Sequence, residues 1–537
     1  MDYYCYFSVN WIGIIKNTLT VLKQNTSPPG DKIIKNNGHI FDYQLKTLIV
    51  GLGETGYSCA KFLVKKKCPF EICDTRKDAP YEKLLHKYFP EVKLISKAKI
   101  DYSLLQQYEQ IIVSPGISTR DESFVQFKQQ GKTIIGDIAL FIQENIQQGN
   151  KPVIAVTGSN GKSTVVTLAE HILKQAGHKV VAGGNLGVPA LDLLEMDAEI
   201  YILELSSFQL ETIPERFSFL EQRVEQKAEQ GTKPSITQNI FTSAVLLNVS
   251  EDHMDRYDSL DDYRKVKESV FNLSKHCVFN KNEWLFDKAL KENQQQSYSE
   301  FSLNNPEKNG YGLVNEEGKT YLAQAICCQP TPLFKKIMPV DDIAISGKHN
   351  YSNILATLAL LEPFVISDSN VVKAIQTYKG LAHRCEWVAN IGQVDYYNDS
   401  KGTNAGATIA AINSYDRPKL LIAGGVGKNA DFSELGQIIN QKIKYAILMG
   451  QDAAQIKNSI ENEQPLEQEE SDKKQALLSI EMVENMQQAV LKAEQLAEPG
   501  DLVLFSPACA SFDMYKNYIE RGNDFICKVK NRVKQQN

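Results

Sequence analysis

The sequence predicts an α/β protein with three domains, and two observations lead to this prediction. The chain has 537 residues, more than one ordinary hydrophobic core accommodates. Three segments, beginning at Leu45, Pro152 and Arg417, repeat one pattern: a short apolar strand, a glycine-rich turn and an amphipathic helix. Strands that alternate with helices in this way are typical of parallel sheets covered by helices.

The first segment holds Gly51-x-Gly53-x-x-Gly56 directly after a strand, and Asp74 closes the next strand. This spacing is the fingerprint of a Rossmann-like dinucleotide site, in which a diphosphate lies at the start of the helix. The pattern fits NAD, another ligand with a diphosphate, or a glycine turn that only packs the helix on the strand. The residues alone leave these interpretations open.

The second segment places a short phosphate-loop sequence between a strand and a helix: Gly158, Ser159, Asn160, Gly161, Lys162, Ser163 and Thr164. The common loop G-x-x-x-x-G-K-[ST] has a first glycine, a position that Val156 occupies here. The context still directs backbone N–H groups and the positive helix end toward the turn. Lys162 is expected to reach the β- and γ-phosphates of ATP, and Ser163 or Thr164 to bind Mg²⁺. The alternative is a tight turn with an exposed lysine.

Two later strands end in acidic or imidazole side chains. Glu204 ends the strand in YILELSSFQLETI, and Asp252 and His253 follow the strand in VLLNVSEDHMDRY. A carboxylate at the end of a strand beside a phosphate loop is placed to hold Mg²⁺, and the histidine could bind metal or orient substrate. A surface glutamate and a structural histidine are the alternatives.

The third segment belongs to a block with four polar motifs: HRCE, NDSKGTN, GGVGKNADF and SPACASFDMYKNYIERG. Each puts polar groups at a strand end or in a loop, where α/β proteins bind ligands. Taken singly, each could be only a turn or a solvated charge. Four in one domain favour a second ligand site facing the phosphate loop.

We place the domain boundaries near residues 140 and 380. Residues 1–44 then form an extension of unknown role, 45–140 a Rossmann-like domain, 141–380 a central domain with a parallel sheet of the P-loop ATPase type, and 381–537 a second Rossmann-like domain. The polar segments 221–239 and 460–475 are expected to be surface loops without chemistry.

Composition limits the partners of the protein. A net charge of −6 argues against a nucleic-acid footprint. There is no apolar run of about 18 residues and no basic stretch at the start, so we expect neither a transmembrane helix nor a signal peptide. The ten cysteines form no C-x-x-C pair, which is typical of reduced cysteines in a cytoplasmic protein.

Taken together, the motifs resemble the Mur ligases, and among them the members that add D-glutamate. The resemblance runs from about Leu45 to the C-terminus and is carried, in order, by TGSNGKST, GGNLGVPAL, LELSSFQLE, LNVSEDHMDRY, SGKHNYSN, HRCE, NDSKGTN, GGVGKNADF and SPACASFD. TGSNGKST alone would also fit a folylpolyglutamate synthetase, whereas LELSSFQLE, EDHMDRY and SPACASFD point to D-glutamate. The first 40 or so residues and the insertion 217–242 have no counterpart.

The resemblance implies an ATP-dependent amide ligase of peptidoglycan synthesis, and hence a role in cell-wall formation, cell shape and division. ATP would phosphorylate the carboxylate of UDP-MurNAc-L-Ala, and the amine of D-glutamate would displace phosphate from the acyl phosphate. Phosphorylation is needed because oxide is a poor leaving group. The resemblance also implies two Mg²⁺ ions and a monomer.

Residue roles follow from the same resemblance. Lys162 would neutralise the transferring phosphate, Ser163 and Glu204 would hold one Mg²⁺, and His253 and Lys267 would hold a second. Lys267 falls where the family has a carbamylated lysine, although Lys265 lies two residues away. A carbamate makes lysine anionic, and forming one requires a neutral amine.

The other implied contacts form three groups. The nucleotide would contact the phosphate loop, Asn350, Asn353, Arg384 and Asp399. The D-glutamate pocket would contain Thr403, Lys428, Ser511 and Tyr518, with Lys401 as a further substrate-binding residue. The UDP-substrate would contact Thr55, Thr75, Arg76, Ser114, Pro115 and Gly116, and Asn185, Ser206 and His253 nearer its sugar–peptide end. Three positions depart from the family pattern: Tyr518, Val426 and Gly402.

Three alternatives remain open. The protein could be another Mur-type or folylpolyglutamate-type ligase that adds a different amino acid. It could be an NAD-dependent oxidoreductase built on Gly51–Gly56, although this leaves the phosphate loop unexplained. It could also be a scaffold that binds nucleotide without releasing phosphate.

Overall fold

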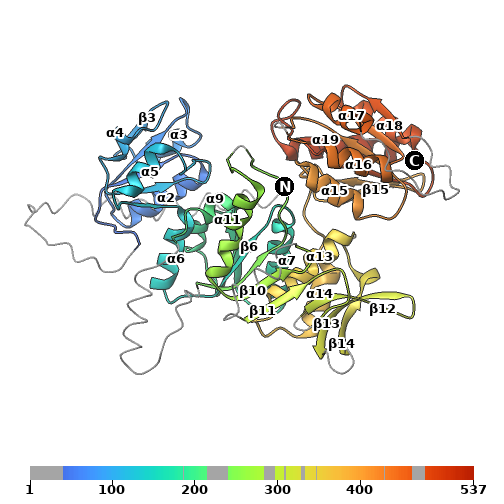
Figure 1. The fold of residues 1–537 in the computed structure, drawn as a ribbon, viewed down its shortest axis with the longest axis horizontal. Coiled ribbons are helices and arrows are strands. Elements are labelled where there is room, and N and C mark those ends of the chain that lie inside the picture. The colour runs from blue at the N-terminus through green and yellow to red at the C-terminus, as the bar shows by residue number, and fades with distance from the viewer. Residues whose placement is uncertain are drawn as a thin grey trace, which may run out of the picture. The chain divides into compact units, whose positions relative to one another are not determined.

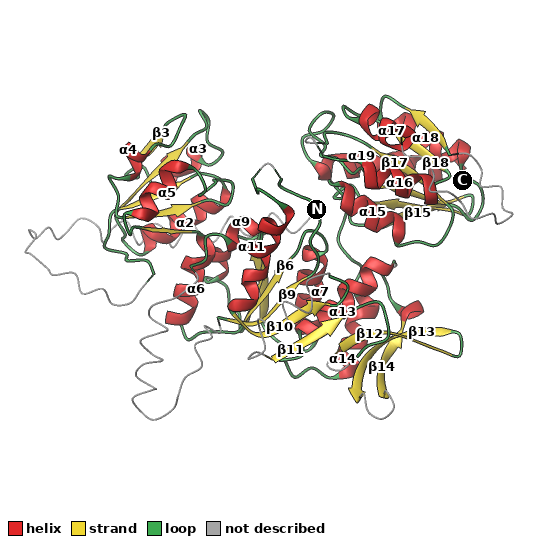
Figure 2. Ribbon diagram, in the orientation of Figure 1, coloured by secondary structure: helices red, strands yellow, loops and turns green. Residues whose placement is uncertain are grey.

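The computed structural model describes residues 40–185, 187–214, 240–254, 256–283, 297–307, 310–327, 333–345, 347–427, 430–462 and 478–536 (Figure 1). Three sheets follow one another along the chain, with helices packed around the strands of each sheet (Figure 2). The predicted α/β class with three sheet regions is confirmed. Residues 1–39, most of the insertion 217–242, most of the loop 460–475 and Lys428 lie outside the described residues.

The N-terminal sheet contains five parallel strands in the order β3-β2-β1-β4-β5. Alternate side chains of β1 enter different apolar clusters: Leu48 and Val50 pack with α4 and α5, whereas Ile49 packs with α2. The strands are β1 (Thr47–Val50), β2 (Phe70–Asp74), β3 (Leu94–Ser96), β4 (Gln110–Val113) and β5 (Thr133–Ile135); the helices are α2 (Glu54–Lys65), α3 (Glu82–Tyr88), α4 (Tyr102–Leu105) and α5 (Glu122–Gln129).

The central sheet contains nine strands in the order β14-β13-β12-β11-β10-β9-β6-β8-β7. Strands β6 to β12 pair in parallel, whereas β13 and β14 add an antiparallel edge that the sequence did not predict. Ile154 and Val156 of β6 pack with α7 and α13, and Ala155 packs with α11 on the other face.

The strands of the central region are β6 (Val153–Thr157), β7 (Val180–Gly184), β8 (Ile200–Glu204), β9 (Phe241–Leu246), β10 (Ser274–Asn280), β11 (Ser297–Phe301), β12 (Gly310–Glu316), β13 (Lys319–Cys327) and β14 (Leu333–Pro339). Its helices are α6 (Asp137–Gln147), α7 (Lys162–Gln175), α8 (Ala190–Leu193), α9 (Ser207–Leu210), α11 (Leu260–Asn272), the short 3₁₀ helix η1 (Val340–Asp342), α13 (Lys348–Leu360) and α14 (Asp368–Thr377).

The C-terminal sheet has the order β15-β16-β20-β17-β18-β19, parallel except for the β15–β16 pair. Leu420 and Ile422 of β17 pack with α18 and α19, and Leu421 packs with α15, α16 and α17. The strands are β15 (Glu386–Ile391), β16 (Val394–Asn398), β17 (Lys419–Ala423), β18 (Tyr445–Leu448), β19 (Ser479–Met482) and β20 (Leu502–Phe505); the helices are α15 (Ala405–Asn413), α16 (Ser433–Lys442), α17 (Ala453–Asn462), α18 (Met486–Leu496) and α19 (Tyr518–Gln536).

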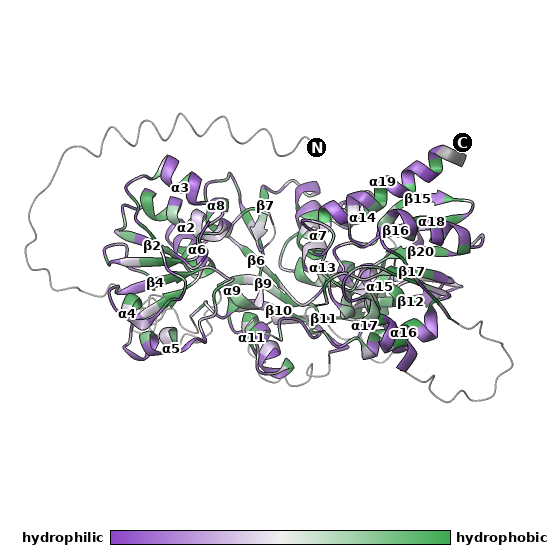
Figure 3. Cartoon of the chain, turned by 90° about the horizontal axis from the view of Figure 1, so that it is seen from above, coloured by the Kyte–Doolittle hydropathy of each residue, from purple (hydrophilic) through white to green (hydrophobic). Residues whose placement is uncertain are grey.

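The apolar cores are distributed unequally among the three regions. One cluster runs from Phe41 to Phe279 and combines side chains of the N-terminal and central regions, with α6 in its middle. The two C-terminal clusters contain only buried residues between Val388 and Val529. Figure 3 shows apolar strands such as β6 and β20 in green, whereas helix α3 is mostly hydrophilic. Among the described helices, none has the length and apolarity needed to cross a membrane.

Candidate active site

The predicted phosphate loop lies between the end of β6 and the start of α7. Gly161 has a left-handed φ of +85°, and a Cβ there would come within 2.5 Å of Asn353 Oδ1. The loop is held by Asn248, which follows β9: the Ser159 N–H donates to the Asn248 carbonyl over 2.9 Å, and the Asn160 N–H donates to Asn248 Oδ1 over 2.8 Å. The N–H groups at the start of α7 thus border a loop of defined shape, an arrangement suited to phosphate.

Two lysines converge on the carbonyl oxygen of Gly158. Lys162 Nζ donates to it over 2.6 Å, and Lys267 Nζ donates to it over 3.0 Å. Burial, and next the charge of Lys162, hold the pKa of Lys267 well below its ordinary value, and burial also lowers the pKa of Lys162. Two amines crowded at one loop favour a polyanionic ligand, which would relieve their repulsion.

The structure distinguishes the two lysines that the sequence left in competition on α11. Lys267 is 1% exposed and reaches the phosphate loop, and its Nζ lies 4.6 Å from the centre of the Tyr263 ring. Lys265 is exposed to solvent. Of Lys265 and Lys267, only Lys267 is therefore placed to contact a ligand of the loop.

Ser163 and Glu204 lie within hydrogen-bond distance of each other. Ser163 Oγ donates to Glu204 Oε2 over 2.7 Å, and Asn185 Nδ2 donates to Glu204 Oε1 over 3.0 Å. Glu204 ends β8 and is 4% exposed. A hydroxyl and a buried carboxylate beside a phosphate loop form an oxygen donor set that suits Mg²⁺. These residues therefore fit the first predicted ion.

His253 adopts an unusual backbone conformation, with φ +59°. Its ring centre lies 4.7 Å from that of Phe208, and its Nε2 lies 3.7 Å from the Asp252 carboxylate. The described residues include no group of three or more His, Cys, Asp or Glu side chains arranged to hold a metal. A second ion held by His253 and Lys267 would therefore need phosphate oxygens and water as further ligands, which is usual for Mg²⁺.

The predicted nucleotide contacts come from α13 and from the start of the C-terminal region. Asn350 and Asn353 are buried on α13. Arg384 Nη2 donates to Ser163 Oγ over 2.8 Å, so the C-terminal region reaches the phosphate loop. Asp399 accepts from Ser506 Oγ over 2.7 Å, and burial raises its pKa to about 6.

The structure brings together part of the predicted D-glutamate pocket. Lys401 Nζ lies 3.9 Å from the centre of the Tyr518 ring, and burial, followed by the charge of Arg384, lowers the pKa of Lys401 to about 8. Ser511 is buried, and Thr403 lies in the same loop as Lys401. A backbone bridge between Val426 and Ala510 joins the GGVGK and SPACAS loops. Lys428 lies outside the described residues.

A pocket of about 530 Å³ lies where the N-terminal region meets the central one. Seven predicted substrate contacts line it: Thr55, Thr75, Arg76, Ser114, Pro115, Gly116 and Asn185. The sequence did not single out Gln209, Ile117 or Pro189, which also line it. Ser206, a predicted contact, is not among the lining residues; it caps α9 in a capping box with Gln209.

Asp74, which a dinucleotide fingerprint would use for a ribose hydroxyl, is already engaged. Its Oδ2 accepts the Leu52 N–H over 2.6 Å and Arg76 Nη2 over 2.7 Å, and its Oδ1 accepts Arg76 Nε over 2.9 Å. Although burial opposes ionisation, these bonds hold the pKa of Asp74 at about 2. Asp74 therefore orients Arg76 at the pocket wall and is poorly available to a ribose.

Comparison with known proteins places this site in a family. Three family models match in order: the MurD-like N-terminal domain of Mur ligases (residues 45–136), the Mur ligase middle domain (156–224 and 228–361) and the Mur ligase glutamate ligase domain (383–509). The UDP-N-acetylmuramoylalanine–D-glutamate ligase of Pseudomonas aeruginosa is 39% identical over 486 residues, which cover 90% of this chain and 97% of that protein. The chain belongs to the Mur ligase family.

Further Mur ligases support this membership. The ligase of the same name from Coxiella burnetii is 38% identical over 483 residues, covering 89% of this chain and 97% of that protein. Among solved structures, MurF from Acinetobacter baumannii aligns with a TM-score of 0.52 at 14% identity, covering 89% of this chain and 90% of that chain. A pseudomurein peptide ligase type C from Methanothermus fervidus aligns with a TM-score of 0.51 at 15% identity, covering 90% and 100%. The structural likeness shows the Mur ligase fold, and family membership disfavours the oxidoreductase alternative.

Proposed function

We propose that this Mur ligase joins D-glutamate to the carboxylate of UDP-MurNAc-L-Ala, with cleavage of ATP to ADP and phosphate. The observation that carries the proposal is the match over nearly the whole length of D-glutamate-adding ligases. The site supports it, because Lys162, Ser163 and Arg384 surround one loop suited to phosphate.

The first step would transfer the γ-phosphoryl group of ATP to the substrate carboxylate. The bond between this phosphorus and the ADP oxygen breaks as the bond to the carboxylate oxygen forms. Lys162 and Arg384 would neutralise charge on the phosphate oxygens, since phosphoryl transfer depends mainly on positioning and charge stabilisation. Ser163 and Glu204 would hold Mg²⁺, which when bound also draws charge from those oxygens.

The second step would form the amide. The neutral amine of D-glutamate attacks the acyl carbon to form a C–N bond, and the nitrogen gives a proton to water. The bond between the acyl carbon and the phosphate oxygen then breaks, and the tetrahedral intermediate releases inorganic phosphate. Lys401, with a pKa of about 8, is mostly protonated at neutral pH and would bind a carboxylate or phosphate group. Thr403, Ser511 and Tyr518 would line the amino-acid pocket, with Lys428 assigned from sequence alone.

The N-terminal pocket would receive the UDP portion of the substrate. Thr55 lies in the first turn of α2, where backbone N–H groups favour a diphosphate. Asn185 lines this pocket and also donates to Glu204 over 3.0 Å. Asn185 therefore links the UDP pocket to the predicted Mg²⁺ site. This link is needed because the substrate must extend from the UDP pocket until its carboxylate reaches the γ-phosphate.

Three finer features belong to the same proposal. Lys267 would be carbamylated and would help His253 hold a second Mg²⁺; its burial and depressed pKa support the neutral amine that carbamate formation needs. The enzyme would act as a monomer. It would work in the cytoplasm, where ATP is supplied.

The test is phosphate release from Mg-ATP in the presence of UDP-MurNAc-L-Ala, with D-glutamate compared against L-glutamate, D-alanine and meso-diaminopimelate. We expect release only with the UDP-substrate and D-glutamate together. Release with another amino acid would reassign the acceptor within the family. No release with any combination would leave a nucleotide-binding scaffold.

Gly161→Ala is expected to lower kcat for phosphate release by about 10-fold. A left-handed alanine costs about 1 kcal/mol, and its Cβ would displace Asn353 from the loop. Gly177→Ala is the matched control, because Gly177 at the end of α7 has φ +92° with nothing within 4 Å of its Cβ. Equal kcat values for the two variants would show that the Asn353 contact does not matter.

A further inference from the structure

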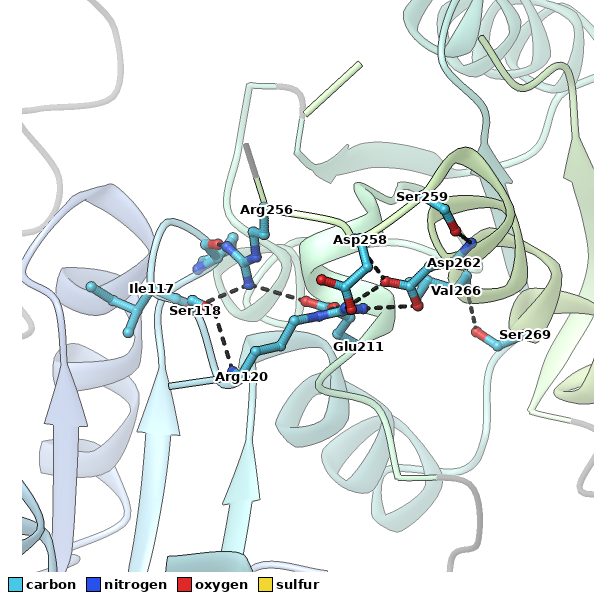
Figure 4. A network of polar contacts seen from close by, with 11 residues as sticks. Ile117, Ser118, Arg120, Glu211, Arg256, Asp258, Ser259, Asp262, Val266 and Ser269 are labelled. Atoms are coloured by element: carbon cyan, nitrogen blue, oxygen red, sulfur yellow. Dashed lines mark hydrogen bonds and ion pairs between the residues drawn. The ribbon is translucent and has the colours of Figure 1, made fainter. Parts of the chain in front are cut away.

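Five charged side chains meet where the wall of the UDP pocket contacts the central region (Figure 4). We call four of them, Arg120, Glu211, Arg256 and Asp262, the charge network; the fifth, Asp258, is exposed to solvent and lies 3.9 Å from Arg120. Arg120 precedes α5, Glu211 is the C-cap of α9, and Asp262 lies in the first turn of α11. Glu211 accepts from Arg120 Nε over 2.9 Å and from Arg256 Nη2 over 3.1 Å, one bond at each oxygen. The carboxylate of Glu211 therefore joins the two arginines.

Arg256 holds the pocket wall directly. Its Nη1 donates to the Pro115 carbonyl over 2.8 Å, and its Nη2 donates to the Ile117 carbonyl over 3.0 Å. Pro115 and Ile117 line the UDP pocket. The Arg256 side chain is 9% exposed, and its guanidinium lies 3.9 Å from the centre of the Phe208 ring. One planar cation with little exposure thus fixes two backbone carbonyls of the pocket loop.

Arg120 connects the same wall to the helix that touches the phosphate loop. Its guanidinium pairs with both oxygens of Asp262. On the same helix, the Tyr263 hydroxyl lies 3.4 Å from Ser159 Oγ, and Lys267 Nζ donates to the Gly158 carbonyl. A short path of contacts therefore runs from the UDP pocket through the charge network to the phosphate loop.

We propose that Arg120 and Arg256 are positioning residues that set the UDP-pocket loop relative to the phosphate loop, so that the bound UDP-substrate presents its carboxylate to the γ-phosphate. The inference rests on the proposed function. Two reactants held in separate regions react efficiently only when their relative position is fixed, and a small displacement lowers the rate strongly. Neither arginine needs to touch the reacting atoms to have this effect.

Arg120 is the member to test, because it contacts side chains only and its replacement leaves Arg256 on the pocket loop. In Arg120→Ala we expect kcat to fall about 10-fold and KM for UDP-MurNAc-L-Ala to rise about 5- to 10-fold, while KM for ATP and for D-glutamate stays within about 2-fold. Asp262→Ala should act in the same direction. KM for the UDP-substrate in the double variant should be no higher than in the more impaired of the two single variants, because both substitutions remove one shared interaction.

Two controls separate positioning from general damage. Asp261→Ala removes the neighbouring, exposed acid of the same helix turn and should leave every KM unchanged. Arg120→Lys keeps the charge without the fork and should recover part of the affinity. Raising the salt concentration should increase KM for the UDP-substrate in the wild type and much less in Arg120→Ala, because ions screen this partly exposed pair.

Calorimetric titration with UDP-MurNAc-L-Ala tests the network without turnover. Binding about 5-fold weaker in Arg120→Ala, alongside the lower kcat, supports the proposal, whereas unchanged binding and kcat, or an equal rise of all three KM values, overturns it. Wild type that binds the UDP-substrate but releases no phosphate would contradict the proposed function instead. The two failures are thereby distinguishable.

Discussion

Lys162→Ala is expected to lower kcat for phosphate release by about 10³-fold or more, the range found when a charge-stabilising group is removed from a reacting centre. Lys162 Nζ lies against the loop carbonyls of Gly158 and Ser159, at 2.6 and 2.9 Å, where the β- and γ-phosphates would bind. Without the ammonium group, the negative charge on the transferring phosphoryl group is no longer neutralised by Lys162.

Lys174→Ala supplies the matched control for this experiment. Lys174 lies in the last turn of the same helix, α7, and pairs with Glu170 at the surface over 2.6 Å. It should retain wild-type kcat, and circular dichroism should show equal helix content in both variants. Turnover by Lys162→Ala at more than a tenth of the wild-type rate would remove Lys162 from the proposed mechanism.

Lys267→Ala and Lys267→Arg are both expected to lower kcat by about 10³-fold. Alanine removes the buried amine that reaches the Gly158 carbonyl. Arginine keeps a positive charge but stays protonated, so it forms no carbamate. If Lys267 acted only as a cation, Lys267→Arg would preserve much of the activity. If Lys267 is the precursor of an anionic carbamate, Lys267→Arg should be as damaging as Lys267→Ala.

Lys265→Ala is the control, since Lys265 is exposed two positions away on the same helix. It should behave as wild type. Native mass spectrometry of the wild type in bicarbonate buffer should show one added CO₂ that is absent from both Lys267 variants. An active Lys267→Arg enzyme would argue for a simple cationic role and against the carbamate.

The parts of the site predictable from sequence are those built within one strand–turn–helix unit. The loop Gly158–Thr164 is formed by the end of β6, a glycine with left-handed φ and the start of α7, and these three parts are consecutive in the sequence. The pocket of the N-terminal region, which the family resemblance assigned to the UDP-substrate, has a related basis. Thr55, Thr75 and Ser114 come after neighbouring parallel strands, whose carboxyl ends share one edge of the sheet.

The parts that sequence did not predict depend on contacts between distant segments. Asn248 shapes the phosphate loop from the segment after β9, and Arg120 meets Asp262 across 142 positions of chain. Arg120 and Asp262 carry no local signal, because a surface arginine and an acid in a first helix turn are common. The antiparallel edge β13–β14 was not predicted for a different reason: the strand–glycine–helix pattern indicates parallel sheets, and strands joined by hairpins do not contain it.

The unequal distribution of the apolar cores has a consequence for how ligases of this kind diversify. Because the buried apolar residues of the C-terminal region pack among themselves, a lineage could exchange that region with little loss of core packing, provided that the incoming region restores the contact of Arg384 with Ser163. The N-terminal region has no such freedom, since its side chains complete a cluster begun in the central sheet. Recombination should therefore tolerate a crossover near residue 380 far better than one near residue 140, where α6 sits inside the shared cluster.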